Sequence, residues 1–227
     1  MFYVKIMSLT LNEAPQKFKE FYGRNVEQMP LLITEGRTPL SVAGLMQKRL
    51  ETRTASAEVK SSWMDNYFDT GDAVVYHPNG NVKIVLDSQT LREMNSQSKR
   101  NGGALVLGED VYNALQGEEF NREQLGILET SLSTRGVKFH PVWRALACDE
   151  KLLNEYTDLV FAEAKQKFGY DTNMGVYLGS AQGKTPEMRA VYVVRLGGWS
   201  DVGGGGYLDD DDGRLVGVAP EAQSAKI

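Results

Sequence analysis

The chain has 227 residues, of which 41% are hydrophobic and 24% charged, a composition typical of globular proteins and not of disordered or fibrous ones. Its length suits one large domain or two small ones. No run approaches the roughly 20 apolar residues of a membrane-spanning helix, and the N-terminus lacks the pattern of a signal peptide. The single cysteine, Cys148, excludes an intramolecular disulfide and favours a reducing compartment. We therefore expect a cytoplasmic protein without a membrane segment.

Charge is distributed unevenly along the chain, whose formal net charge is −5. The first 102 residues hold 13 Lys and Arg against 11 Asp and Glu, and the remainder holds 12 against 19. The best candidates for a basic patch are Lys48, Arg49, Arg53 and Lys60. They are interspersed with acidic residues, a pattern typical of a solvated helix face. The sequence therefore carries no strong nucleic-acid signature.

The first half of the chain combines strand and helix patterns. Residues 2–9 alternate apolar and polar side chains, which predicts a half-buried strand. Apolar residues then recur at helical spacing, and Thr38 or Ser41 can cap the predicted helix. These apolar residues are Val42, Leu45, Met46 and Leu50. Further on, the β-rich runs 73–76 and 82–86 surround the turn sequence His-Pro-Asn-Gly-Asn and predict a β-hairpin.

The second half follows a polar segment, residues 96–103, that is a candidate boundary or long loop. A helix is predicted from about residue 150 to a stop at Gly169, with an i,i+4 pair between Glu163 and Lys167. Its apolar stripe is Leu153, Tyr156, Val160 and Ala164. The runs MGVYLG, MRAVYVVRL and GRLVGVAP are strand-like.

Hairpins and helices occur in blocks, without regular alternation of strand, helix and parallel strand. This arrangement predicts an α+β fold, with antiparallel β-hairpins packed against several amphipathic helices. We expect a single domain over residues 1–227, with the candidate boundary near 96–103 and a flexible loop, rich in Gly and Asp, over 197–213.

The tripeptide Gly183-Lys184-Thr185 looks like the end of a phosphate-binding loop. Such a loop needs another glycine five positions earlier, where this chain has Leu178, and a helix directly afterwards. The residues that follow Pro186 are β-branched and aromatic and favour a strand. We therefore interpret the segment as a hairpin loop, and we expect Lys184 not to bind nucleotide.

The stretch YFDTGDAVV resembles short motifs of two families. Asp69-Thr70-Gly71 is similar to the catalytic triplet of aspartic proteases, which use two carboxylates that share a proton, whereas this chain has one triplet. Thr70-Gly71-Asp72 is similar to a hairpin of adenylate-forming enzymes, a resemblance that implies Asp72 as a ribose ligand. Too few residues precede it for the large N-terminal domain of that family. We keep Asp69, Asp72 and the nearby His77 as candidate ligand-binding residues in a hairpin.

The run Asp209 to Asp212 follows four glycines and offers oxygen ligands for calcium or magnesium. An EF-hand is excluded, because placing Gly213 at its sixth position puts Leu208 and Ala219 at ligand positions. A solvated, mobile acidic loop is the favoured interpretation, with Asp209 and Asp211 as candidate metal ligands. No sequence feature places a histidine beside Cys148, which is expected to be buried or inert.

Two functional hypotheses remain. The first is a non-catalytic binding or assembly protein of the cytoplasm, without a cofactor and with an unidentified protein or small-molecule partner. The second is a metal-assisted hydrolase or transferase that uses clustered aspartates. Convergence of the aspartates of residues 65–87 and 201–212 in one pocket would favour the enzyme.

Overall fold

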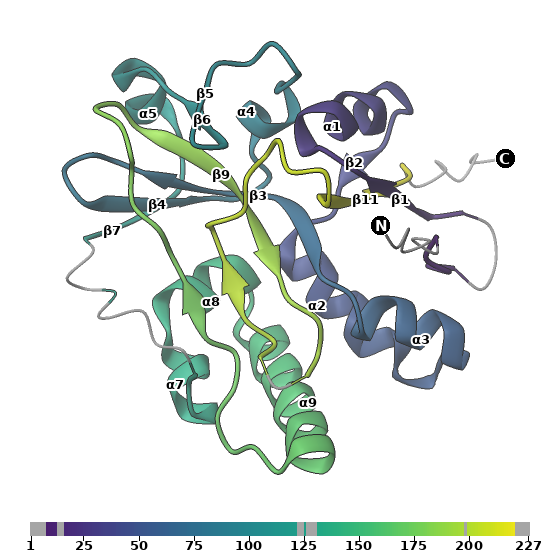
Figure 1. The fold of residues 1–227 in the computed structure, drawn as a ribbon. Coiled ribbons are helices and arrows are strands. Elements are labelled where there is room, and N and C mark those ends of the chain that lie inside the picture. The colour runs from purple at the N-terminus through teal and green to yellow at the C-terminus, as the bar shows by residue number, and fades with distance from the viewer. Residues whose placement is uncertain (1–7, 13–15, 122–124, 126–130, 198, 221–227) are drawn as a thin grey trace, which may run out of the picture.

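The computed structural model describes residues 8–12, 16–121, 125, 131–197 and 199–220. Its α-helices are α1 (Asn25–Thr34), α2 (Val42–Glu51), α3 (Ala57–Met64), α4 (Gln89–Arg92), α5 (Glu109–Ala114), α7 (Thr134–Phe139), α8 (Pro141–Ala147) and α9 (Glu150–Phe168). Its strands are β1 (Phe18–Tyr22), β2 (Thr38–Pro39), β3 (Phe68–Tyr76), β4 (Asn81–Val85), β5 (Arg100–Asn101), β6 (Ala104–Val106), β7 (Glu118–Asn121), β8 (Val176–Tyr177), β9 (Glu187–Val193), β10 (Val202–Gly203) and β11 (Arg214–Val218). A sheet crosses the middle of the molecule, and helices cover both of its faces (Figure 1).

The sheet is mixed. Its main path runs β1-β11-β3-β9-β10-β8, and β3 also pairs with β4. The expected hairpin is confirmed, because Ala73 pairs with Val85 and Tyr76 with Val82. The α+β class is also confirmed, but the pairing is not limited to antiparallel hairpins: β11 runs parallel to β3, and β10 runs parallel to β8. Strands far apart in the sequence therefore lie side by side. Strand β6, which directly follows residues 96–103, pairs with β9.

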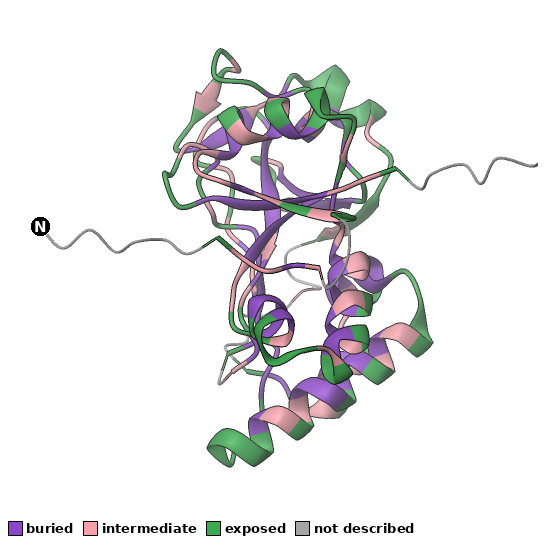
Figure 2. Cartoon of the chain, turned by 90° about the vertical axis from the view of Figure 1, so that its right-hand side faces the viewer, coloured by how far each residue is buried: buried purple, intermediate pink, exposed green. Residues whose placement is uncertain are grey.

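The central strand β3 is buried along its whole length. Because side chains alternate between the two faces of a strand, Val74 and Tyr76 join one hydrophobic cluster and Ala73 and Val75 join the other. The first cluster packs under α2, α3, α8 and α9, and the second under α1, α4 and α5 (Figures 1 and 2). A strand buried on both faces explains the continuous apolar run at residues 73–76.

The two predicted helices are confirmed as α2 and α9. Ser41 caps α2 by accepting a hydrogen bond from Gly44 N at 3.0 Å. Helix α9 ends at Gly169, whose φ of 74° is the left-handed conformation that favours glycine. Its predicted pair is present, with Lys167 Nζ 3.0 Å from a Glu163 oxygen.

Arg49 corrects the interpretation of the basic residues as a solvated helix face, because its side chain is fully buried. Its guanidinium donates to the carbonyl oxygens of Trp63 and Asn66, both at 2.9 Å, and to Tyr156 Oη at 2.8 Å. Such a fork of donors compensates for the loss of hydration. Arg49 therefore joins α2 to α3 and α9 from within the core.

Two expectations have different outcomes. The strand expected over residues 2–9 lies mostly outside the described residues, and Ser8 and Leu9 belong to neither helix nor strand. Within the described part of the chain, no helix is both long and apolar enough to cross a membrane.

Candidate functional site

The Gly-Lys-Thr segment wraps a carboxyl group of the chain itself. The two oxygens of Glu187 accept hydrogen bonds from Gln182 N at 2.8 Å and Gly183 N at 2.9 Å, and Asn101 Nδ2 donates to the same carboxyl at 2.7 Å. Glu187 is fully buried, whereas Lys184 is exposed. The backbone donors that a phosphate would need are thus already used.

This segment is not a hairpin loop, which corrects the sequence interpretation. It connects β8 to β9, and these strands are not neighbours, because β10 lies between them in the sheet. The parallel pairing of β8 with β10 could not be read from the short apolar run at residues 176–177.

Asp72 holds two backbone segments in place. Its carboxyl oxygens accept hydrogen bonds from Val42 N at 2.7 Å, at the start of α2, and from Asp87 N at 2.9 Å. Burial raises the pKa of Asp72 to about 6, and the hydrogen bond from Val42 opposes the rise. The contact also holds Asp87 at a φ of 47°, which Asp tolerates better than most residues. Asp72 is therefore engaged within the fold.

Asp69, near the start of β3, has a similar role. Its Oδ2 accepts a hydrogen bond from Arg214 N at 2.8 Å, where β11 begins. Burial raises the pKa of Asp69 to about 6, although the hydrogen bond from Arg214 lowers it. Asp201 also has a pKa raised by burial to about 6, and its Oδ1 accepts from Gly175 N at 2.6 Å. The buried aspartates thus bind backbone N–H groups of separate segments.

His77 lies in the turn of the β3–β4 hairpin. Its Nδ1 accepts a hydrogen bond from Asn79 N at 3.1 Å, and its Nε2 lies 3.1 Å from Glu109 Oε2. Its ring packs 4.7 Å from the Tyr112 ring, centroid to centroid. The three candidate ligand residues of β3 and its turn therefore have separate partners and do not form one site.

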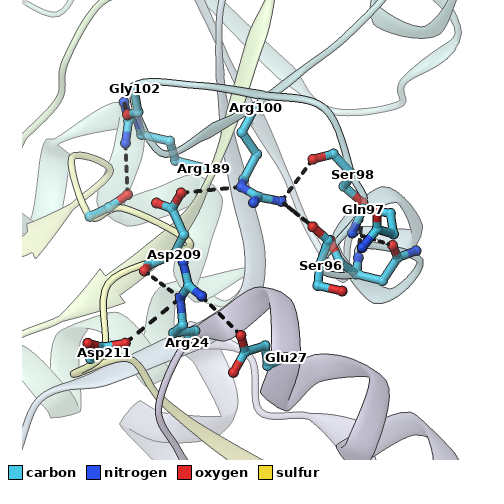
Figure 3. Close-up of polar contacts among 12 residues, drawn as sticks. Arg24, Glu27, Ser96, Gln97, Ser98, Arg100, Gly102, Arg189, Asp209 and Asp211 are labelled. Atoms are coloured by element: carbon cyan, nitrogen blue, oxygen red, sulfur yellow. Dashed lines mark hydrogen bonds and ion pairs between the residues drawn. The ribbon is translucent and has the colours of Figure 1, made fainter.

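The acidic loop is held by arginines from distant parts of the chain (Figure 3). Arg24 Nε donates to the Asp209 carbonyl oxygen at 2.9 Å and lies 3.8 Å from Asp211 Oδ1. Arg100 Nε lies 3.3 Å from Asp209 Oδ2, and its Nη1 donates to the Ser98 carbonyl oxygen at 2.8 Å. Asp209 thus links Arg24, directly before α1, to Arg100, the first residue of β5, while the Asp211 side chain is 97% exposed.

Metal binding at Asp209 and Asp211 stays a prediction that the structure supports poorly. Their side chains point to different arginines, which compete with a cation for the carboxylates. Across the described residues, no three or more His, Cys, Asp or Glu side chains are grouped so that they could hold a metal ion. Asp212 lies close enough to Asp69 for its negative charge to raise the pKa of Asp69, but these two carboxyl groups are not joined by a third group that could complete a metal site among the described residues.

Aromatic and cationic side chains flank the acidic loop at both ends. Arg189 donates to the Gly206 carbonyl oxygen at 3.0 Å, and its guanidinium lies 5.0 Å from the ring centroid of Tyr207, which is 47% exposed. At the other end, the Arg214 guanidinium lies 5.1 Å from the ring centroids of both Tyr22 and Tyr67.

The loop continues between these ends with an exposed acidic run. Tyr67 Oη donates to the Asp212 carbonyl oxygen, and the side chains of Asp210, Asp211 and Asp212 are exposed. We name the resulting strip the loop surface. It consists of Tyr22, Arg24, Tyr67, Tyr207 and Asp210–Asp212. The tyrosines and arginines were missed in the sequence, because nothing local links residues 22–24 and 67 to residues 207–212.

Cys148 was expected to be buried or inert, and the structure removes the first alternative, because the residue is exposed. Burial of part of the thiol still raises its pKa, and the negative charge of Asp72 adds to the rise. A raised pKa reduces the thiolate fraction at neutral pH, which agrees with an unreactive thiol.

No protein-family model matches the sequence, and no curated protein is significantly similar to it. A solved structure is similar to this chain, with a TM-score of 0.66 and 17% sequence identity; it comes from work on the accommodation of massive sequence variation in Nanoarchaeota by the C-type lectin fold. The similarity covers 92% of this chain and 99% of that one. At this identity the likeness shows the fold alone: the chain has an α+β architecture similar to the C-type lectin fold.

Proposed function

We propose that the chain is a non-catalytic binding protein that recognises a basic segment of a protein partner with the loop surface. The observation that carries the proposal is an exposed run of carboxylates on a backbone that is held in place. Asp210, Asp211 and Asp212 point to solvent, while Asp209 is paired with Arg100 and the Asp209 carbonyl oxygen accepts from Arg24. A loop ordered before binding loses less conformational entropy when the partner arrives.

The side-chain types support recognition. Tyrosine supplies a large contact area with few rotatable bonds, which is the reason that antibody paratopes are rich in it. Tyr207 is exposed, and Tyr22 and Tyr67 are half-buried beside Arg214. Three adjacent carboxylates next to these rings favour a ligand with Lys or Arg side chains, which pair with carboxylates and also lie over aromatic rings.

The similar solved structure adds a second expectation. That structure belongs to work in which the C-type lectin fold accommodates massive sequence variation. We propose that the exposed positions of the loop surface in this chain likewise tolerate substitution, because the backbone is held by residues beneath them. A cytoplasmic setting is proposed from the single cysteine alone, and immunodetection in cell fractions tests it.

Peptide display tests the proposed recognition. Wild-type protein is expected to select peptides with two or more Lys or Arg and one aromatic residue. A variant with Asp210, Asp211 and Asp212 changed to Asn is expected to bind the selected peptides at least about tenfold more weakly, since each charged hydrogen bond contributes roughly 1.5–3 kcal/mol.

A charge-matched control changes exposed acidic residues outside the loop surface: Asp158→Asn, Asp171→Asn and Glu155→Gln. This control is expected to bind the selected peptides like the wild type. Equal loss of affinity in the two variants would show that the weaker binding comes from the change in net charge and not from the loop surface. Selection of peptides without basic residues would contradict the proposed ligand.

A further inference from the structure

A pocket of about 550 Å³ lies away from the loop surface, between the start of β1, β2, the whole length of α2 and the end of α4. Its lining includes three cationic side chains, Lys17, Lys48 and Arg92, together with the hydroxyl groups of Thr38 and Ser41. Volumes of roughly 300–1,000 Å³ are typical of small-molecule sites. The pocket is therefore large enough for a small organic ligand.

The two lysines are positioned by an aromatic ring. Lys48 Nζ lies 4.9 Å and Lys17 Nζ 5.8 Å from the ring centroid of Phe18. The Lys48 side chain is only 20% exposed, so its charge is partly shielded from water. Cations held over a ring in this way lose fewer side-chain conformations when a ligand binds.

The lining also contains two acidic residues, Glu51 and Asp87. Glu51 lies 3.6 Å from Lys48 Nζ, and Asp87 pairs with Arg92 Nη2. The described lining thus contains three cationic and two acidic side chains, in a chain whose formal net charge is −5. The Arg92 side chain is 22% exposed and lines the pocket, and a guanidinium has five N–H donors, so the contact with Asp87 does not use all of them.

The remaining wall is apolar, with Phe18, Pro39, Leu40 and Val218 beside the cations. A ligand that matches both parts has an anionic, acceptor-rich head and an apolar body. A phosphate monoester has three terminal acceptor oxygens and charge close to −2 at neutral pH, which suits three cations and two hydroxyl groups. A carboxylate offers fewer acceptors and half the charge.

We propose that this pocket binds a small organic phosphate monoester, with the phosphate at Lys17, Lys48 and Arg92 and an apolar body against Phe18 and Leu40. The site is separate from the loop surface, so its test is independent of the proposed function.

Calorimetric titration with phenyl phosphate, at constant ionic strength, tests the proposal. The expected result is a single saturable site with a Kd at least about tenfold lower than that for inorganic phosphate, which lacks the apolar body. Phenol, which lacks the anionic head, is expected not to bind measurably. Amide chemical shifts of Ser41 and Gly44 are expected to move on titration, because both residues line the pocket.

Variants that each remove one charged group test where the ligand binds. Lys17→Gln and Lys48→Gln are each expected to raise the Kd for phenyl phosphate about tenfold. Glu51→Gln is expected to lower it, since the change removes a carboxylate that competes for Lys48. Lys151→Gln is the matched control, because this lysine is 84% exposed on α9 and is not part of the pocket lining.

Lys17 is exposed, so its variant is expected to fold even if the loss of Lys48 weakens the packing around Phe18. Absence of saturable binding to the wild type would overturn the proposal. So would a Kd that Lys17→Gln leaves unchanged, or one that Lys151→Gln raises equally. Equal affinity for phenyl phosphate and inorganic phosphate would overturn the proposed ligand class.

Discussion

The carboxyl group of Glu187 takes the place that a phosphate would need in the Gly-Lys-Thr segment, and its removal gives a sharp test. Glu187→Ala leaves three donors without their acceptor: Gln182 N, Gly183 N and Asn101 Nδ2. A lost partner costs roughly 1–3 kcal/mol for each buried donor, but these three donors are only partly buried and regain some bonds with water. We therefore expect a loss of about 2–4 kcal/mol in the free energy of unfolding.

Glu187→Gln is the finer perturbation. It keeps one oxygen as acceptor but turns an amide NH₂ toward a backbone N–H, so the expected loss is about 1–2 kcal/mol. Urea unfolding followed by circular dichroism measures both values. Lys184→Ala is the control and is expected to change stability by less than about 0.5 kcal/mol, because this side chain is exposed. Stability of Glu187→Gln equal to the wild type would refute the reasoning, as would ATP that stabilises the protein through Lys184.

Two other variants probe the core and the loop. Leu153→Ala removes a side chain that is 1% exposed in α9 and is expected to lower the free energy of unfolding by about 2–5 kcal/mol. An unchanged melting curve would show that this face of the helix is not packed in the core. Arg100→Ala breaks the contacts to Asp209 and to the Ser98 carbonyl oxygen. It is expected to cost about 1–3 kcal/mol and to speed amide exchange at Leu208, whose N–H bonds the Gly103 carbonyl oxygen. Unaltered exchange there would mean that Arg100 does not hold the loop.

Sequence patterns were informative where a segment forms its structure from neighbouring residues. The helix α9 has its apolar stripe, its N-cap Asp149 and its final Gly169 within one continuous stretch. The β3–β4 hairpin likewise has both strands and the turn within residues 68–85. In such segments, periodicity and turn chemistry carry the necessary information.

Pairing between distant strands was not predictable. Strand β9 lies between β3 and β10, and β11 pairs with both β1 and β3. Each of these contacts joins residues far apart in the chain, and no local pattern specifies the partner of a strand. The expected hairpins therefore gave the right class but missed the parallel pairs of the mixed sheet.

The candidate site shows the same limit. The acidic run at 209–212 was visible, but its partners Arg24 and Arg100 lie 185 and 109 residues before Asp209. The charge alone therefore favoured a solvated loop. Asp69 and Asp72 were candidate ligand-binding residues, yet their hydrogen bonds to backbone N–H groups depend on where β11 and α2 lie. Residue type identified the candidates, and tertiary contacts determined their roles.

The buried Asp69 also predicts how stability depends on pH. Its pKa is about 6 in the folded chain because of burial, against 3.8 for an unperturbed Asp. The folded state therefore holds its proton more tightly than the unfolded state. The stabilisation that comes from protonated Asp69 is fully present below about pH 4 and is lost as the pH rises through about 6. At 1.36 kcal/mol for each factor of ten in proton affinity, the loss is roughly 2–3 kcal/mol.

Asp69→Asn isolates this contribution, because the amide oxygen can still accept from Arg214 N but the side chain no longer ionises. Relative to the wild type, the variant is expected to gain roughly 2–3 kcal/mol in unfolding free energy between pH 4 and pH 7. Asp171→Asn, at a site that is 76% exposed, controls for a change in net charge. Urea unfolding at closely spaced pH values gives the difference directly. A difference between Asp69→Asn and wild type that stays constant with pH would show that the carboxyl group of Asp69 does not titrate between the two values. In that case the hydrogen bond from Arg214, and not burial, would determine the ionisation of the group that holds β11 to β3.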